Sequence, residues 1–150
     1  MEEYLPILRS LHLAGENYAV IGTWALKVYF PELMREYALH DCDVVLAPDE
    51  ANVRRAIAAL NAQGWETSVW DECVDAGSPS TDFVGKYYVR AKQGELVLDL
   101  TYECMIDWAQ MGPARVLTDR LWLASVTDIA TLKRLKGTTH DLDLLRKLCL

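Results

Sequence analysis

The sequence predicts an α/β or α+β domain, with a mixed β-sheet flanked by helices and two helices at its C-terminal end. Short apolar segments bounded by turn residues alternate with amphipathic segments over residues 2–70. A hairpin pattern follows at residues 83–102, and helical spacing returns after residue 127. Early strands separated by helices, followed by a hairpin, favour a mixed sheet with helices packed on it.

The first half of the chain is predicted to alternate between helix and strand. Apolar residues at helical spacing indicate the helices, and short apolar runs between turn residues indicate the strands. Pro31 ends the second helix, because proline cannot continue one. A turn at 14–17 ends the first helix. The predicted helices are 2–13, 24–30 and 48–63, and the predicted strands are 18–21, 42–46 and 65–70.

The second half is predicted as a loop, a hairpin and two helices. Glycine, serine and proline mark the acidic loop, and Thr127-Asp128 is a cap for the first of the helices. Residues 103–124 show no clear pattern. The expected elements are a loop at 72–82, strands at 83–90 and 95–102 around a turn at 92–94, and helices at 127–135 and 140–150.

Composition favours one compact soluble domain over residues 1–150. The chain is 51% hydrophobic and 25% charged, which is ordinary for a globular protein. Its formal net charge of −7 argues against a nonspecific nucleic-acid binder, which needs a basic face. The acidic charge does not exclude a nucleotide substrate whose own negative charge is balanced by magnesium.

The sequence also favours a cytoplasmic protein with no membrane partner. Its four cysteines are scattered and lack metal-binding spacing, so we expect free thiols in a reducing compartment. The acidic start, residues 1–4, has no feature of a signal peptide. No apolar run approaches the length of a membrane span.

Three aspartates are the candidate metal ligands. Asp41 and Asp43 flank Cys42 at the start of a predicted buried strand, and residues two apart on a strand share a face. Asp99 interrupts the apolar run 96–100. Unpaired carboxylates in buried strands are costly, and convergence around Mg²⁺, which prefers oxygen ligands, would make them tolerable. An Asp-x-Asp pair on its own also fits a solvated turn.

Gly22 and Thr23 are candidate phosphate contacts. They lie between a predicted strand and a predicted helix, where backbone N–H groups and a hydroxyl can meet a phosphate. Gly22 would allow a close backbone approach. An ordinary strand-to-helix turn explains these two residues equally well.

Several motifs together resemble the nucleotidyltransferase superfamily with the polymerase-beta-like fold. The layout is similar to that of small lincosamide and aminoglycoside nucleotidyltransferases, and to nucleotidyltransferase-like toxins of abortive-infection systems. In chain order, this layout is a strand, a Gly-Ser or Gly-Gly turn, a helix, a strand that begins with Asp-x-Asp, and a later strand with a third aspartate. The resembling segments are 18–26, 40–45, 95–100, 128–133 and 140–145.

This resemblance implies a fold, a reaction and residue roles. Asp41 and Asp43 would hold Mg²⁺ or Mn²⁺ with a nucleoside triphosphate such as ATP. Asp99 would be a further ligand or the general base for the acceptor hydroxyl, and Gly22 and Thr23 would touch the triphosphate. The reaction would transfer a nucleoside monophosphate to a hydroxyl and release pyrophosphate.

Charged residues outside the aspartate motif have two readings each. Lys86 and Arg90 share one face of the predicted strand 83–90 and could meet the triphosphate, although a solvated strand edge is the alternative and we favour it for Arg90. Lys133 is near the site in the resembling families, or is a helix-surface lysine. We expect structural roles for Asp141 and Asp143.

The chain departs from the family pattern in ways that leave other functions open. Thr23 stands where serine or glycine is usual, Cys42 replaces an aliphatic residue, and the chain adds little to the core domain. The alternatives are an inactive nucleotide-binding or antitoxin-like module, and a toxin that modifies tRNA or protein. The acidic charge favours a small cationic acceptor, and a homodimer could complete the acceptor pocket.

Overall fold

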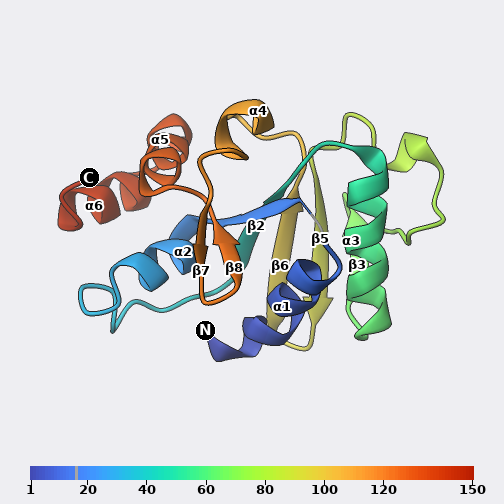
Figure 1. The fold of residues 1–150 in the computed structure, drawn as a ribbon, viewed down its shortest axis with the longest axis horizontal. Helices are drawn as coiled ribbons and strands as arrows, with labels where there is room; N and C mark the ends of the chain where they lie inside the picture. Colours follow the sequence, from blue (N-terminus) through green and yellow to red (C-terminus); the bar gives the residue numbers. More distant parts are fainter. Residues whose placement is uncertain (16) are drawn as a thin grey trace.

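The computed structural model describes residues 1–15 and 17–150 and contains a mixed sheet surrounded by helices (Figure 1). In the described residues eight strands form one sheet, in the order β4-β3-β5-β6-β2-β1-β8-β7. At its centre β1 (Tyr18–Ile21) pairs antiparallel with β2 (Cys42–Leu46), and β2 pairs parallel with β6 (Leu96–Thr101). The predicted mixed sheet with flanking helices is therefore confirmed.

Five further strands extend this centre on both sides. On one side β5 (Tyr88–Gln93) joins β6, and β3 (Glu66–Val69) and β4 (Glu72–Cys73) follow, all in antiparallel pairs. On the other side β8 (Leu121–Leu123) lies parallel to β1, and β7 (Val116–Thr118) pairs antiparallel with β8. The aspartate-bearing strands β2 and β6 therefore lie inside the sheet.

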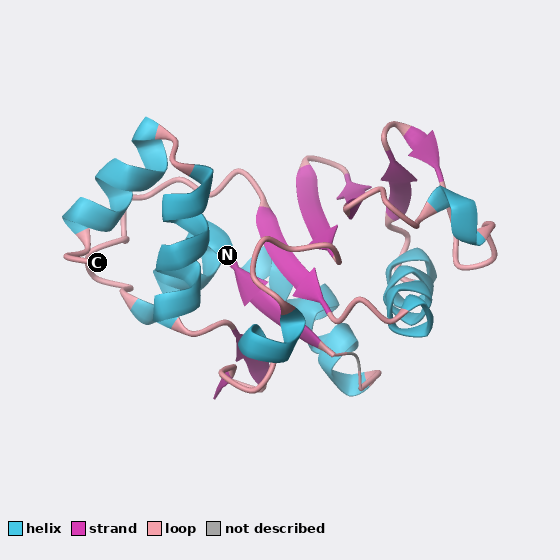
Figure 2. Ribbon diagram, turned by 90° about the horizontal axis from the view of Figure 1, so that it is seen from above, coloured by secondary structure: helices cyan, strands magenta, loops and turns pink. Residues whose placement is uncertain are grey.

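The helices pack in two groups. Helix α1 contacts α3, whereas α2 contacts α5, and α5 contacts α6. The C-terminal pair α5 and α6 forms one end of the molecule, and α3 lies at the other (Figures 1 and 2). The bounds are α1 Leu5–Leu13, α2 Gly22–Tyr29, α3 Glu50–Ala62, α4 Trp108–Met111, α5 Val126–Lys136 and α6 Thr139–Lys147, with short 3₁₀ turns at Glu2–Tyr4 and Ser80–Asp82.

Polar caps define where the main helices begin. Asp49, Ser125 and Thr138 each accept a hydrogen bond from the backbone N–H three residues later, at the starts of α3, α5 and α6. Gly137 ends α5 in the left-handed conformation, with φ +66°. The predicted cap at residues 127–128 therefore lies two residues too late, because Ser125 is the residue that caps the helix.

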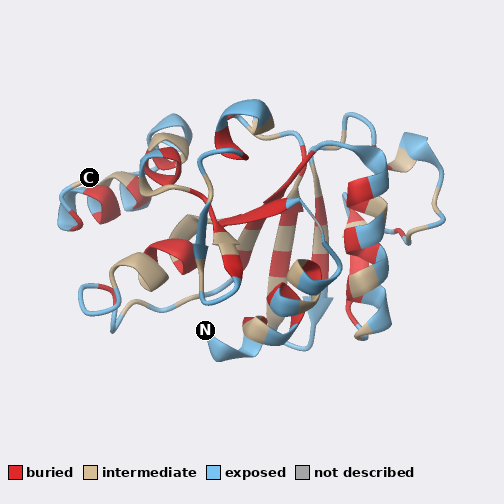
Figure 3. Ribbon diagram, viewed as in Figure 1, coloured by how far each residue is buried: buried red, intermediate tan, exposed pale blue. Residues whose placement is uncertain are grey.

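Alternation along the central strands separates the core from the site. Val44, Leu98 and Leu100 are fully buried on one face of the sheet, and the core continues from them toward the helices (Figure 3). Asp43 and Asp99 occupy the intervening positions, so their side chains point to the opposite face. At these positions the sheet therefore presents apolar residues on one face and carboxylates on the other.

The predicted hairpin exists, but its first strand is displaced. Gly85 and Tyr87 have φ of +72°, which is incompatible with an extended strand, and β5 therefore begins at Tyr88. The turn falls at residues 94–95 instead of 92–94, because Gln93 pairs with Leu96. Lys86 consequently lies before the strand, although the sequence pattern placed it on the strand beside Arg90.

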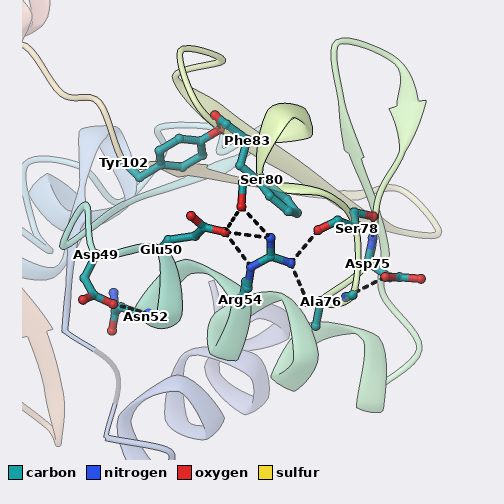
Figure 4. Close-up of polar contacts among 11 residues, drawn as sticks. Asp49, Glu50, Asn52, Arg54, Asp75, Ala76, Ser78, Ser80, Phe83 and Tyr102 are labelled. Carbon is teal, nitrogen blue, oxygen red and sulfur yellow. Dashed lines mark hydrogen bonds and ion pairs between the residues drawn. The ribbon is translucent and has the colours of Figure 1, made fainter.

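The predicted loop at 72–82 contains strand β4 and a 3₁₀ turn, and α3 holds it in place. Arg54 Nη1 donates to the carbonyl oxygens of Ala76 at 2.9 Å and Ser78 at 2.6 Å (Figure 4). The Ser80 hydroxyl donates to the Glu50 carboxylate at 2.6 Å, and Arg54 pairs with the same carboxylate. These contacts fix the loop against α3.

Residues 103–124, for which the sequence showed no pattern, form α4 and the β7–β8 hairpin. The turn predicted at 14–17 includes residue 16, which lies outside the described residues. The predicted free thiols agree with the structure, in which all four cysteines are unpaired. Within the part of the chain that the structure describes, every helix is too short or too polar to cross a membrane.

Candidate metal and nucleotide site

The structure brings Asp41, Asp43 and Asp99 together. Asp43 and Asp99 are directly opposite each other in the parallel β2–β6 ladder, and Asp41 immediately precedes β2. One carboxylate oxygen from each residue lies within 4.8 Å of the other two. A single cation could therefore contact all three side chains after small rotamer changes.

Burial and the neighbouring carboxylates destabilise the charged form of Asp43. Burial, followed by the neighbouring charges of Asp41 and Asp99, raises the pKa of Asp43 from 3.8 to about 6. Lys133 and Lys136 oppose this shift only in part. A divalent cation would relieve this repulsion, and the all-carboxylate donor set is the oxygen-rich type that Mg²⁺ and Mn²⁺ prefer. The residues present therefore fit such an ion.

Gly22 makes room for Asp43. It has φ +70° as the first residue of α2, and a Cβ atom built there would lie 2.4 Å from Asp43 Oδ2. Asp43 thus packs directly against the backbone at the N-terminus of a helix, where N–H groups are unpaired and the dipole is positive. The glycine predicted as a phosphate contact therefore also has a defined steric role beside the carboxylate.

A buried ion pair stands beside this turn. Lys133 on α5 donates to Asp141 Oδ1 on α6 at 2.5 Å, and its ammonium lies 3.5 Å from Thr23 Oγ1. Burial alone would raise the pKa of Asp141, but hydrogen bonds from Lys133 and Thr138 outweigh it and lower the pKa. Lys133 is only 8% exposed, so it is a cation of the site and its reading as a surface residue is wrong.

Arg90 is the second cation at the aspartates. Its Nε donates to Asp99 Oδ1 and its Nη2 to Asp99 Oδ2, both at 2.8 Å. The two residues face each other across the antiparallel β5–β6 ladder. Arg90, Asp99 and Asp43 therefore form one row across three neighbouring strands, and our preference for Arg90 as a solvated edge residue is corrected.

A cavity of about 650 Å³ contains the aspartates, Arg90, Thr23 and Lys133. The segment 36–41 forms one wall, and residues of α5 and α6 form another. A smaller, more apolar cavity of about 250 Å³ adjoins it and shares Asp43 and Lys133. The loop at 72–82, which sequence reasoning considered as a cover, contributes no residue to either lining.

A larger groove lies away from the aspartates. It has a volume of about 810 Å³ between α1, α2 and the β7–β8 hairpin, and its lining is mainly apolar. Its lining brings no group of three acidic ligands together, whereas the smaller polar cavity contains one. The polar cavity is therefore the better candidate for binding a charged ligand.

Lys86 is the one predicted site residue that the structure places elsewhere. Its ammonium lies 4.0 Å from the centre of the Trp70 ring, and it lines a separate cavity near β3 and β4. The cause is the displaced start of β5, which leaves Lys86 in the turn before the strand. Gly22, Thr23 and the three aspartates, by contrast, border the adjoining cavities.

Sequence reasoning missed or underrated three features of the cavity. Tyr37, in the segment predicted as a connector, lines the cavity and its hydroxyl lies 3.1 Å from His140 Nε2. Lys136 lines the cavity because α5 extends one residue beyond its predicted end. Arg90 lines it because the hairpin register places Arg90 opposite Asp99. Placing the two-residue turn at Gly94-Glu95 would have paired Arg90 with Asp99 from the sequence alone.

Comparison with known proteins adds little to this geometry. No protein-family model and no curated protein matches the sequence. Among solved structures, the fold is similar to that of an H. pylori protein provisionally named a nucleotidyltransferase, at 18% identity and a TM-score of 0.49, covering 87% of this chain and 56% of that chain. The fold is also similar to that of JHP933 from Helicobacter pylori, at 18% identity and a TM-score of 0.46, covering 87% of this chain and 54% of that chain.

The chain spans about half the length of these H. pylori proteins. At this identity and TM-score, neither likeness carries information about activity.

Proposed function

We propose that the protein transfers a nucleoside monophosphate from a nucleoside triphosphate to a hydroxyl, with a divalent cation at the aspartate cluster. The observation that carries this proposal is the convergence of three carboxylates within 4.8 Å at the N-terminus of α2. Carboxylates that bind metal next to unpaired backbone N–H groups suit a metal–phosphate ligand. The sequence resemblance to nucleotidyltransferases supports the same reaction class.

Each residue has a defined task in this proposal. Asp41 and Asp43 hold the cation, which would supply charge neutralisation for the phosphates. The backbone at Gly22 and the hydroxyl of Thr23 bind phosphate oxygens, and Lys133, already 3.5 Å from that hydroxyl, adds positive charge. Catalysis of this kind depends on positioning and on electrostatic stabilisation more than on covalent chemistry by the protein.

In this proposal Asp99 acts on the acceptor hydroxyl as the general base. The acceptor oxygen would bond to the α-phosphorus, the bond to the β-phosphate oxygen would break, and pyrophosphate would leave. Asp99 would receive the proton of the acceptor hydroxyl. The net charge of −7 favours a small cationic acceptor over RNA, and the adjoining apolar cavity offers space next to Asp43 for part of a ligand.

Thermal unfolding tests this proposal. We expect at least one of the four ribonucleoside triphosphates to raise the unfolding midpoint in the presence of Mg²⁺, because a ligand of the folded state stabilises it by mass action. Asp43→Asn should abolish the shift, measured against its own nucleotide-free midpoint. Asp143→Asn, a matched change on the exposed side of α6, should keep it.

The outcomes separate the candidate functions. A Mg²⁺-dependent shift together with pyrophosphate release in the presence of an acceptor supports transfer. A shift without turnover, across a panel of aminocyclitols, tRNA and proteins, would favour the inactive nucleotide-binding module. The absence of any shift with all four nucleotides would contradict nucleotide binding by this chain.

A further inference from the structure

Asp99 already has a cationic partner within the chain. The guanidinium of Arg90 donates to both carboxylate oxygens of Asp99 at 2.8 Å. Such a bidentate pair is among the stronger hydrogen-bonded contacts in proteins and fixes the orientation of both groups. Asp99 is therefore not equivalent to Asp41 and Asp43 as a ligand for an added cation.

Arg90 also interacts with a second carboxylate of the cluster, that of Asp41. Its pKa is raised first by the hydrogen bond to Asp99, then by the charge of that residue, with a smaller contribution from Asp41. The Arg90 side chain is 41% exposed whereas that of Asp99 is 14% exposed. The arginine thus reaches the aspartates from the cavity wall, and it can leave them without opening the core.

Apart from Asp99, the surroundings of Arg90 offer few contacts that would hold its guanidinium in place. In residues 1–15 and 17–150 the other ring or ion-pair contact of its guanidinium is the Tyr88 ring, whose centre is 5.8 Å from the guanidinium carbon. Its position at the cavity lining also makes it accessible to a ligand. An incoming anion could therefore compete directly with Asp99 for the guanidinium.

We propose that Arg90 is an internal counter-ion of the aspartate cluster and stays paired with Asp99 until a nucleotide binds. Before then, the cluster offers an added cation mainly the carboxylates of Asp41 and Asp43. A triphosphate would take over the guanidinium, because phosphate oxygens match its bidentate donors, and Asp99 would then be released for the reaction. This role rests on the function proposed above.

The counter-ion role predicts an effect that a purely structural ion pair does not. Removing a positive charge from beside a cation site strengthens cation binding, since like charges repel at this range. Removing a structural support would leave binding unchanged or weaken it. The sign of the change in metal affinity therefore decides between the two roles.

The test is a Mn²⁺ titration without nucleotide, with free Mn²⁺ followed by electron paramagnetic resonance. Arg90→Gln should bind Mn²⁺ roughly tenfold more tightly, or bind a second ion, because one positive charge is lost and Asp99 is freed. Arg90→Lys should lie in between, because lysine keeps the charge but cannot form the bidentate pair. Arg146→Gln, which removes the same charge from an exposed pair with Asp143, should match wild type.

Asp43→Asn separates failure of this inference from failure of the proposed function. If the Asp43→Asn change abolishes Mn²⁺ binding while Arg90→Gln, folded by circular dichroism, binds it no more tightly than wild type, only the role of Arg90 is overturned. If neither wild type nor Arg90→Gln binds Mn²⁺, the metal site and this inference both fail. Should Arg90→Gln not fold, tighter binding by Arg90→Lys supports the role and unchanged binding overturns it.

Discussion

Gly22 and Asp43 share a space that one methyl group would fill, because a Cβ atom at position 22 would lie 2.4 Å from Asp43 Oδ2. The glycine at the start of α2 and the carboxylate on β2 are therefore a single steric unit. Any side chain at position 22 must displace the carboxylate or the helix start. This relationship joins the candidate phosphate contact to the candidate metal ligand.

Gly22→Ala should therefore lose Mn²⁺ binding, whereas Gly85→Ala should not. The two glycines have nearly the same φ, +70° and +72°, so the backbone conformation alone makes alanine cost about 1–2 kcal/mol of stability at either position. A Cβ atom at Gly85 has nothing within 4 Å. Chemical denaturation and Mn²⁺ titration of both variants check this; equal loss of Mn²⁺ binding in the two would contradict the steric role of Gly22.

Asp43→Asn should stabilise the metal-free protein at neutral pH. The folded-state pKa is raised to about 6 from 3.8, so the folded state binds more protons between these values and stability falls as pH rises through this window. Above pH 6 the charged carboxylate costs up to about 3 kcal/mol relative to the unfolded chain. Urea unfolding of wild type and variant at pH 4 and pH 8 should show a much larger difference at the higher pH.

Asp143→Asn serves as the control for that comparison, since Asp143 is exposed on α6 and pairs there with the exposed Arg146. Its stability difference from wild type should be small at both pH values. A stabilisation by Asp43→Asn that is equal at pH 4 and pH 8 would rule out charge repulsion as its cause.

Lys133→Met should destabilise the protein by roughly 3 kcal/mol, because it leaves Asp141 charged and buried without its partner. Asp141→Asn should be costly for the matching reason. The double variant should lose less than the sum of the two single changes, because it leaves no unpaired charge. Arg146→Met, in an exposed pair, should cost less than about 1 kcal/mol. Urea denaturation of the four variants measures these differences; strict additivity would show that the buried pair is not coupled.

The central fold could be predicted because its signals are local. The apolar runs at β1, β2 and β6 are short and bounded by turn residues, and the resulting strands agree closely with the predicted ranges. Alternation along β2 also placed Asp41 and Asp43 opposite the buried Cys42. The approach of β2 to β6 was suggested by the cost of burying three unpaired carboxylates and by the family resemblance, since parallel pairing leaves no local mark.

The cations of the site depended on register and on tertiary packing. Arg90 reaches Asp99 only because the turn falls at residues 94–95, and moving the turn by one residue reverses which side chains share a face. Lys133 is buried because α6 folds back on α5, a contact between helices that periodicity does not reveal. The β7–β8 strands have three residues each, too few for a clear pattern.

Lys86→Ala should leave Mn²⁺ and nucleotide binding within about twofold of wild type, because Lys86 lies over Trp70 and outside the aspartate cavity. Its contact with the ring is worth at most about 1 kcal/mol at an exposed position. Trp70 is 54% exposed, so the variant should change its fluorescence without altering the fold. Parallel titrations of Lys86→Ala and Lys133→Met, at a temperature where both are folded, measure the effect. A loss of nucleotide affinity in Lys86→Ala as large as that in Lys133→Met would mean that the turn before β5 closes over the nucleotide.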